Sequence, residues 1–251
     1  MKKLYGKAVA ILLVAVMMIT STKWDVLYAS AENQTGTAMD EVAEQFDAYY
    51  LETANETGVM AKVKVEDKWT MNDKGFIAAS KDSVGGVESD VKDVDVLTWK
   101  ERPYTDFELT YTFQTGWDRI GIIFGTAEGQ FPIKKTEQGL EAADGVMFFL
   151  SREGHRGGWS ESLKNDEGNG FFYEANEISG FKDSPEHTLK IVVRERKFYA
   201  YVDGSTEPVQ TLDLPETYKG GYVSFFSATD NHAGMKDFTI TDRNTVDKVA
   251  E

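Results

Sequence analysis

Apolar and polar residues alternate along most of the chain. In the segment 107–114, FELTYTFQ, every second residue is apolar, so an extended strand would bury one face and expose the other. The same alternation, or a short apolar run between turn-forming residues, predicts eight further strands, at 59–65, 119–125, 145–152, 170–175, 187–195, 197–204, 220–228 and 234–242. The pattern therefore indicates a mainly β protein.

Turn signals between these strands indicate how they are arranged. Sequences rich in Gly, Asn and Asp separate them, as at 72–75, 203–204 and 220–221, and no helical pattern is interleaved. Apolar runs such as MFFL and IVV need cover on both faces of a sheet. Two packed antiparallel sheets meet both requirements, so we predict an all-β sandwich.

One segment has helical spacing. From Thr37, a candidate N-cap, to about Ala54, apolar residues recur every three or four positions. These residues are Met39, Val42, Ala43, Phe46 and Tyr50. We therefore predict a short N-terminal helix within a leader at 32–56, followed by a sandwich domain at 57–243 and a polar tail at 244–251.

The first 31 residues have the layout of a secretory signal peptide. Three lysines precede an apolar run, 8–19, that is too short to span a bilayer as a helix. An Ala-Ser-Ala site at 29–31 predicts cleavage before Glu32, and an uncleaved anchor is the alternative. We expect no membrane insertion after cleavage, because the chain has neither a cysteine for lipid modification nor an apolar C-terminal tail. The protein is expected to be secreted or extracellular, either free or attached at the cell surface.

Composition and charge narrow the function classes. With 27 basic and 42 acidic residues the formal charge is −15, and loss of residues 1–31, which hold four lysines and one aspartate, would make it −18. This sign disfavours nucleic acid and anionic membranes as partners. The absence of cysteine excludes disulfide scaffolds, thiolate metal sites and cysteine catalysis, and it fits a bacterial exported protein.

The order of the segments is similar to that of a known superfamily. A tryptophan before a turn in WTMNDKG is followed by the strand DFELTYTF, the hairpin YVDG, the strand GGYVSFFSA and the terminal strand KDFTIT. This series resembles the concanavalin A-like lectin and glucanase superfamily over about residues 57–243. It is most similar to the sugar-binding sandwich modules of bacterial fructan-degrading glycosidases and to the domain family named for keto-disaccharide hydrolysis. The resemblance implies a jelly-roll sandwich whose relatives mostly bind polysaccharide ends, with a minority that cleave them.

Two glycine-bearing loops hold residues suited to sugar binding. Saccharides are recognised by an aromatic plate under the apolar ring face and by planar charged groups that grip hydroxyls in pairs. The candidate ligand-binding residues are Trp117, Arg119, Arg152, His155, Arg156 and Trp159. The alternative is that one tryptophan caps the core and that the arginines balance an acidic surface.

A catalytic role would require paired carboxylates. Asp93 and Asp95 stand at i and i+2, about 7 Å apart on one face of a strand, which is compatible with a glycoside hydrolase. The competing interpretation places both on the solvent-exposed face of an ordinary strand. The segment 69–75 superficially resembles a nucleophile motif of fructan hydrolases, but we expect a strand, a turn and a second strand with Trp69 in the core.

Metal binding is predicted only through the resemblance. The three histidines have no metal-like spacing, so a zinc site is not expected. Relatives in the glucanase branch often hold a structural calcium ion with an aspartate on the last strand, and Asp237 matches that position. No other cofactor is expected.

Three functional hypotheses follow. The favoured one is a secreted, lectin-like carbohydrate-binding domain that recognises the ends or chains of a polysaccharide or oligosaccharide. The second is a glycoside hydrolase or related carbohydrate-active enzyme that uses paired carboxylates. The third is an extracellular protein-adhesion domain, which predicts a flat apolar patch on the surface.

Overall fold

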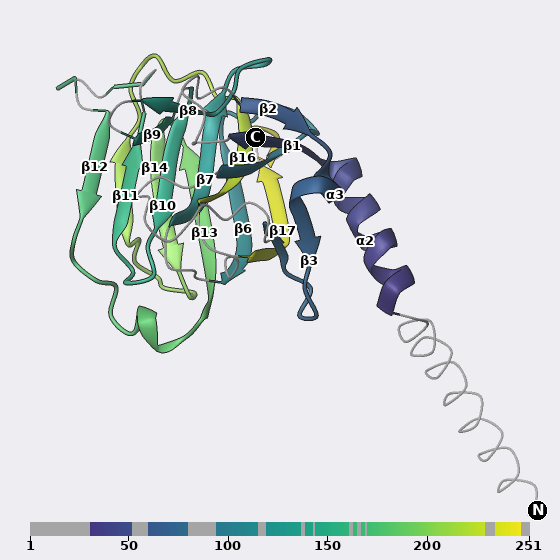
Figure 1. The fold of residues 1–251 in the computed structure, drawn as a ribbon. Helices are drawn as coiled ribbons and strands as arrows, with labels where there is room; N and C mark the ends of the chain where they lie inside the picture. Colours follow the sequence, from purple (N-terminus) through teal and green to yellow (C-terminus); the bar gives the residue numbers. More distant parts are fainter. Residues whose placement is uncertain are drawn as a thin grey trace, which may run out of the picture. The chain divides into compact units, whose positions relative to one another are not determined.

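The computed structural model describes most of the chain after residue 30. The described ranges are 31–51, 60–79, 94–114, 119–136, 139–142, 144–160, 163–164, 167–168, 170–228 and 234–246. The chain divides into two compact units, Met1–Glu41 and Val42–Glu251. The described part of the first unit is helical and belongs to α2 (Ala31–Gln45), which ends in the second unit (Figure 1). The predicted signal peptide lies outside the described residues except for Ala31.

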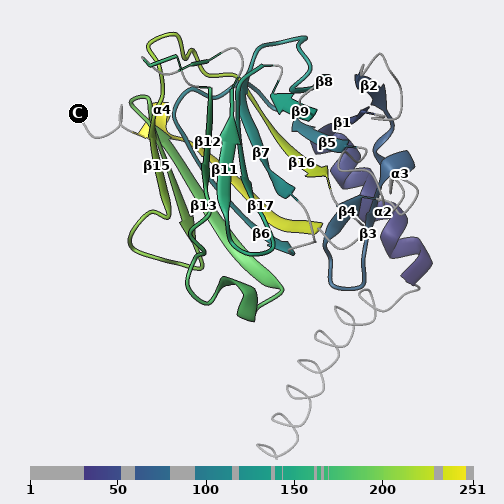
Figure 2. The same ribbon diagram turned by 60° about the vertical axis from the view of Figure 1, so that its left-hand side comes forward.

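The second unit consists of two antiparallel sheets that lie in two layers (Figures 1 and 2). The larger sheet has eight strands in the order β12-β11-β10-β7-β16-β5-β1-β2. Their bounds are β1 Phe46–Leu51, β2 Met60–Val63, β5 Val94–Trp99, β7 Arg119–Thr126, β10 Val146–Leu150, β11 Arg156–Trp159, β12 Phe171–Glu174 and β16 Tyr222–Ala228.

The smaller sheet has seven strands in the order β15-β14-β13-β6-β17-β4-β3. Their bounds are β3 Trp69–Met71, β4 Ile77–Ala79, β6 Phe107–Gln114, β13 Glu186–Arg194, β14 Lys197–Val202, β15 Gln210–Asp213 and β17 Gly234–Asp242. The remaining elements are the hairpin of β8 (Ile133–Thr136) and β9 (Gly139–Ala142), and the short helices α3 (Val65–Lys68), η2 (Phe181–Asp183) and α4 (Arg243–Val246). The predicted all-β jelly-roll sandwich with a short N-terminal helix is confirmed.

Aromatic side chains fill the space between the two sheets. Strand β6 shows the alternation predicted from the sequence. Its apolar residues are buried and the residues between them are partly exposed; the buried residues are Phe107, Leu109, Tyr111 and Phe113. Phe225 of β16 meets the Tyr111 ring edge-on, with centroids 5.1 Å apart. We call the face of the eight-stranded sheet that carries Phe225 its inner face. Burial of each such side chain contributes about 1.5–3 kcal/mol relative to exposure.

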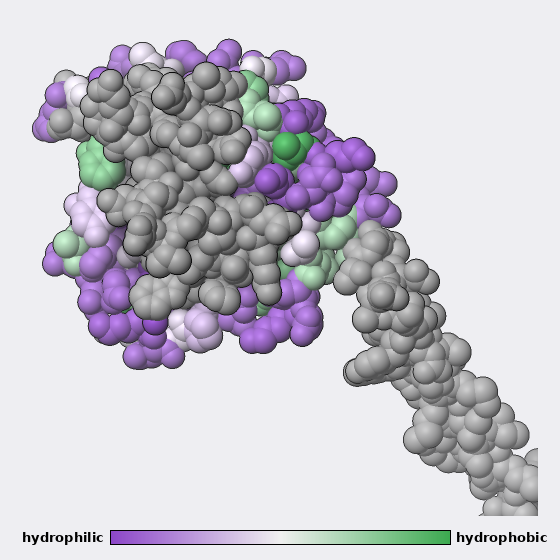
Figure 3. Space-filling view, viewed as in Figure 1, coloured by the Kyte–Doolittle hydropathy of each residue, from purple (hydrophilic) through white to green (hydrophobic). Residues whose placement is uncertain are grey.

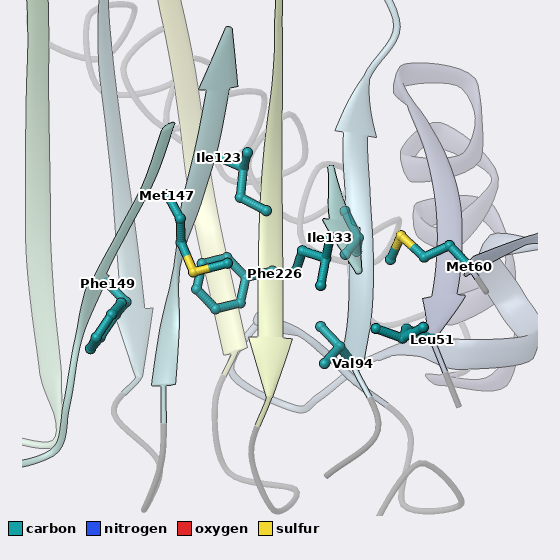
Figure 4. Close-up of a cluster of buried hydrophobic side chains, with 9 residues drawn as sticks. Leu51, Met60, Val94, Ile123, Ile133, Met147, Phe149 and Phe226 are labelled. Carbon is teal, nitrogen blue, oxygen red and sulfur yellow. The ribbon is translucent and has the colours of Figure 1, made fainter. Parts of the chain in front are cut away.

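The outer face of the eight-stranded sheet is also apolar. A buried cluster on this face includes Val94, Met147, Phe149 and Phe226, and Ile133 of the β8–β9 hairpin packs against it (Figure 4). All five residues of β10 are therefore buried. This cover on both faces explains the continuous apolar runs in the sequence.

The predicted helix is wrong beyond Gln45. Residues 46–51 form β1, which pairs with β5 on one side and β2 on the other. The apolar positions of this segment fit a period of two as well as 3.6, and pairing within the sheet decides between them. Phe46 and Ala48 point inward, while Tyr49 packs on the outer cluster. The sandwich thus begins at Phe46 rather than at residue 57.

The fructan-hydrolase-like segment is a structural hairpin, as expected. Trp69 in β3 is 1% exposed, and the Asn72 side chain accepts hydrogen bonds of 3.0 Å from the backbone N–H groups of Lys74 and Phe76. These bonds fix the turn that joins β3 to β4. The segment is therefore a strand, a turn and a second strand, with Trp69 in the core.

The described surface is largely hydrophilic on the face shown in Figure 3, in keeping with the acidic composition. Among the residues that the structure describes, no helix combines the length and the apolar character needed to cross a membrane.

Candidate functional site

The first predicted loop can be placed only in part. Trp117 lies outside the described residues, and Arg119 is the first residue of β7, with a side chain that is likewise outside the described part. The same holds for the side chain of Trp159, whose backbone ends β11 and pairs with Phe171 of β12. These three residues stay predictions.

The second predicted loop is a tight turn between β10 and β11. Ser151 organises it, because its N–H donates to the His155 carbonyl at 3.0 Å and its hydroxyl accepts from the His155 N–H at 3.2 Å. Gly154 has φ of 75°, a left-handed conformation that favours glycine. The turn leaves Arg152 exposed at its tip.

His155 lies beside an aromatic edge of the sheet. The Tyr173 hydroxyl and His155 Nδ1 share a hydrogen bond of 2.8 Å, and the two rings meet edge-on. Tyr173 is 50% exposed and Phe171, two residues before it on β12, is 51% exposed. We call Phe171, Tyr173 and His155 the β12 aromatic edge. Sequence reasoning missed the two aromatic residues because alternation alone does not show that β12 is the last strand of its sheet.

Arg156 is separated from this edge. Its guanidinium forms an ion pair with Glu174 across the β11–β12 ladder and donates to the Asn176 carbonyl at 3.5 Å. The side chain is mostly buried. The structure thus brings Arg152 and His155 to the surface but commits Arg156 to Glu174, so Arg156 would have to leave this partner to grip a sugar hydroxyl.

The candidate carboxylates do not form a surface pair. Asp93 lies outside the described residues. Asp95 in β5 is 1% exposed and alternates with Val94 and Val96 of the outer cluster, so it faces inward beside Ser227. Its carboxylate cannot reach a polysaccharide, and it is not on a solvent-exposed face either. Both interpretations of Asp95 made from sequence are corrected by its burial.

The expected calcium ligand lies in the last strand, β17. Asp237 is exposed in β17 at an irregularity of the β17–β6 pairing, with φ of 58°. Among the described residues no group of three or more His, Cys, Asp and Glu side chains could hold a metal ion. Asp237 as a calcium ligand stays a prediction.

A pocket of about 370 Å³ opens on the outer face of the eight-stranded sheet, at the end where β1, β5 and β16 meet the loop after β7. We call it the β1–β5 pocket. It mixes four aromatic residues with charged and hydroxyl groups. Its described lining is Asp47, Tyr49, Thr98, Trp99, Lys100, Thr126, Ala127, Glu128, Gly129, Gln130, Phe131 and Tyr222.

The strand ladder places the polar floor of the pocket. Asp47 and Thr98 are register partners in β1 and β5, so they project side by side. The Thr98 hydroxyl shares a hydrogen bond of 2.8 Å with the Ser224 hydroxyl of β16. Asp47 forms an ion pair with Lys62 of β2 at 3.0 Å and lies 3.8 Å from Lys100 Nζ.

The loop 127–131 forms the wall of the pocket. The Asp144 carboxylate accepts a hydrogen bond from the Ala127 N–H, and the Gln130 N–H donates to the Ala127 carbonyl at 3.2 Å. These bonds hold the loop so that Phe131, although 41% exposed, meets the Tyr49 ring edge-on at 5.8 Å between centroids. A partly exposed, edge-on aromatic pair results.

Electrostatics keeps the Tyr49 phenol protonated. Partial burial raises the pKa of Tyr49, the negative charge of Asp47 raises it further, and the nearby Lys62 opposes the rise. The bond to Asp47 in turn raises the pKa of Lys62. At neutral pH the pocket therefore offers a phenol that can donate, a carboxylate that accepts, and apolar ring surface beside them.

Nothing in the sequence marked this pocket. Tyr49 and Asp47 fell within the predicted helix, and Phe131 follows a glycine-containing loop with no recognisable motif. One signal could have revealed these residues. Positions 46–50 also fit the period of two that is typical of a strand, with Phe46 and Ala48 on one face and Asp47 on the other.

Comparison with known proteins supports the fold. No family model matches the sequence, and no curated protein matches it. Alginate lyase A1-II', a member of polysaccharide lyase family-7, is 8% identical, with a TM-score of 0.50, and the match covers 80% of this chain and 95% of that chain. The alginate lyase from Klebsiella pneumoniae is 11% identical (TM-score 0.48; 83% and 99% covered), and the carbohydrate-binding module CBM66 from Bacillus subtilis is 13% identical (TM-score 0.45; 69% and 91% covered).

At these identities the likeness concerns the fold alone. The match to the family-7 lyase supports the two-sheet β-sandwich fold. The resemblance to the concanavalin A-like superfamily stays a prediction from the sequence. The closer resemblance to fructan-binding modules stays a prediction.

Proposed function

We propose that this protein is an exported carbohydrate-binding domain and that the β1–β5 pocket is its saccharide site. The observation that carries the proposal is the Tyr49–Phe131 aromatic pair standing over a floor of Asp47 and Thr98 in a pocket of about 370 Å³. Pockets of this size with a few convergent polar groups are typical ligand sites. The family-7 lyase acts on alginate, so the same fold serves a carbohydrate-active protein elsewhere, which supports the proposal by analogy.

Binding would combine stacking with hydroxyl recognition. A pyranose or furanose ring has an apolar face that packs against an aromatic ring, and Phe131 supplies such a ring at the pocket mouth. Sugar hydroxyls would donate to the Asp47 carboxylate and accept from the Tyr49 phenol, and hydrogen bonds to charged groups are the stronger kind. Both rings are already oriented, so little ordering cost remains.

The predicted loop residues form a second part of the proposal. Arg152 and the β12 aromatic edge lie toward the opposite edge of the sheet that carries the pocket. Tyr173 is a register partner of Gly157, which in turn pairs with Phe149 of the outer cluster, so the edge and the pocket share the outer face. A polysaccharide chain bound in the pocket could continue toward this edge, with Trp159 and Arg119 as further predicted contacts.

Calorimetric titration of the purified protein with a panel of oligosaccharides tests the proposal. For a ligand that binds, Phe131→Ala is expected to weaken affinity about tenfold, since loss of a stacked ring costs about 1.5 kcal/mol. Tyr199→Ala is the matched control, because Tyr199 is a half-buried aromatic residue on the other sheet.

Two outcomes would contradict the proposal. If no saccharide binds, the protein is not a carbohydrate-binding domain. If affinity is unchanged in Phe131→Ala but falls in Tyr173→Ala, the binding site is the β12 aromatic edge and not the pocket.

A further inference from the structure

The β1–β5 pocket has an unequal balance of charge. Its described lining holds two carboxylates, Asp47 and Glu128, and one ammonium group, that of Lys100. Lys62 stands outside the lining but pairs with Asp47. The chemistry of the saccharide that fits depends on whether these cations are available to a ligand.

Both cations are already engaged. Lys100 Nζ donates to the Ala43 carbonyl at 2.6 Å and lies 3.8 Å from Asp47, and its backbone N–H is bonded to Gln45 at 2.9 Å. Lys62 Nζ lies 3.0 Å from the same Asp47 oxygen. Both ammonium groups thus lie against Asp47, and the Ala43 carbonyl also holds that of Lys100.

Glu128 adds a negative charge at the mouth of the pocket. It lies in the exposed loop 127–131, and within the described part of the chain it has no ion-pair partner. Asp144 holds the base of the same loop through its bond to the Ala127 N–H. The chain as a whole carries a formal charge of −15, which acts in the same direction.

We infer that the β1–β5 pocket selects uncharged saccharides and rejects uronic acids. The inference rests on the proposed function. Among the described residues, a uronate carboxylate entering the pocket would meet Glu128 at the mouth, while the two nearby ammonium groups already lie against Asp47. Such juxtaposition of like charges disfavours a wrong partner. A neutral sugar instead binds favourably to the same carboxylates, because its hydroxyls donate hydrogen bonds to them. The pocket therefore differs in chemistry from a site built for a polyuronate.

Paired titrations at low salt test this inference. Neutral oligosaccharides with gluco, manno and fructo units are compared with polymannuronate and polyguluronate fragments of equal length. For the wild-type protein we expect the best neutral ligand to bind at least about tenfold more tightly than any uronate fragment. Glu128→Lys is expected to narrow that ratio by improving uronate binding. Glu207→Lys, on the loop before β15 of the other sheet, changes the net charge equally and should leave the ratio unaltered.

The outcomes separate the inference from the function on which it rests. The selectivity is overturned if uronate fragments bind as tightly as neutral ones. It is also overturned if Glu128→Lys and Glu207→Lys change the ratio of neutral to uronate affinity equally. Neither result contradicts carbohydrate binding itself. Binding of no saccharide of either class overturns the proposed function itself.

Discussion

The His187 ring lies parallel to the Phe181 ring, with centroids 3.8 Å apart, and each of its nitrogens lies within hydrogen-bond distance of an oxygen atom. Nδ1 lies 2.7 Å from an Asp203 carboxylate oxygen, and Nε2 lies 3.0 Å from the Ser184 carbonyl oxygen. Asp203 also accepts from the Thr188 N–H at 2.9 Å. The sequence showed only that this histidine lacks metal-like spacing. Its hydrogen-bond partners lie in a turn and a hairpin, and the alternation of apolar residues does not predict that these two segments come together. Its geometry is that of a residue that fastens the β13–β14 hairpin to η2.

Replacement of His187 by Ala should destabilise the protein by about 3 kcal/mol, since a buried ring and its hydrogen bonds are lost together. Urea denaturation of His187→Ala and of His155→Ala, whose ring is only partly buried, gives the comparison. A loss of stability no larger for His187→Ala than for His155→Ala would show that the network is not structural.

At the scale of the element, β1 is the strand that alternation should have revealed and did not. Its residues FDAYYL follow directly on a helix, and their apolar positions continue the helical spacing for one more turn. Pairing within the sheet makes this segment a strand, because β5 lies on one side of it and β2 on the other. The Phe46 ring also contacts the rings of Phe225 and Phe238, with centroids less than 6 Å apart. Such long-range partners are invisible to a local pattern.

Phe46→Ala should therefore lower the free energy of unfolding by about 3–5 kcal/mol, as for a core aromatic residue. Glu44→Ala, an exposed change two residues earlier in α2, should have little effect. Chemical denaturation distinguishes the two. Equal stability of both variants would mean that residues 46–51 lie in a leader outside the core.

Glu108 links two strands of the seven-stranded sheet to the short helix α4. It lies on β6 and pairs with Lys190 of β13 at 2.9 Å and with Arg243 of α4. Burial raises the pKa of the Glu108 carboxyl, but the hydrogen bonds from Lys190 and Arg243 outweigh burial, so the pKa lies below its ordinary value. The link therefore stabilises the fold above the ordinary pKa of about 4.3, and this stabilisation is lost as the pH falls through the lowered pKa.

Glu108→Gln should cost about 1 kcal/mol at pH 7, and the difference from wild type should shrink toward zero at pH values below the folded pKa. Denaturation curves at pH 7 and in a series down to pH 2.5 measure this, with Glu207→Gln as the exposed control. A difference that does not change with pH would show that the carboxylate charge plays no part.

For the whole molecule, local alternation was sufficient to predict the sandwich, since all nine predicted strands are present and strands such as β6 and β13 bury the predicted apolar face. The binding surface could not be predicted in the same way. The β1–β5 pocket joins residues from strands far apart in sequence with the loop 127–131, and the β12 aromatic edge exists because β12 ends its sheet. Both features depend on the order of the strands in the sheet, and this order cannot be predicted from the local pattern of a single sequence.

A crystal structure with a bound neutral oligosaccharide tests the central claim most directly. The account predicts a sugar ring against Phe131 and Tyr49, with a hydroxyl hydrogen-bonded to the Asp47 carboxylate. A saccharide seated instead on Phe171 and Tyr173, with the β1–β5 pocket unoccupied, would contradict it.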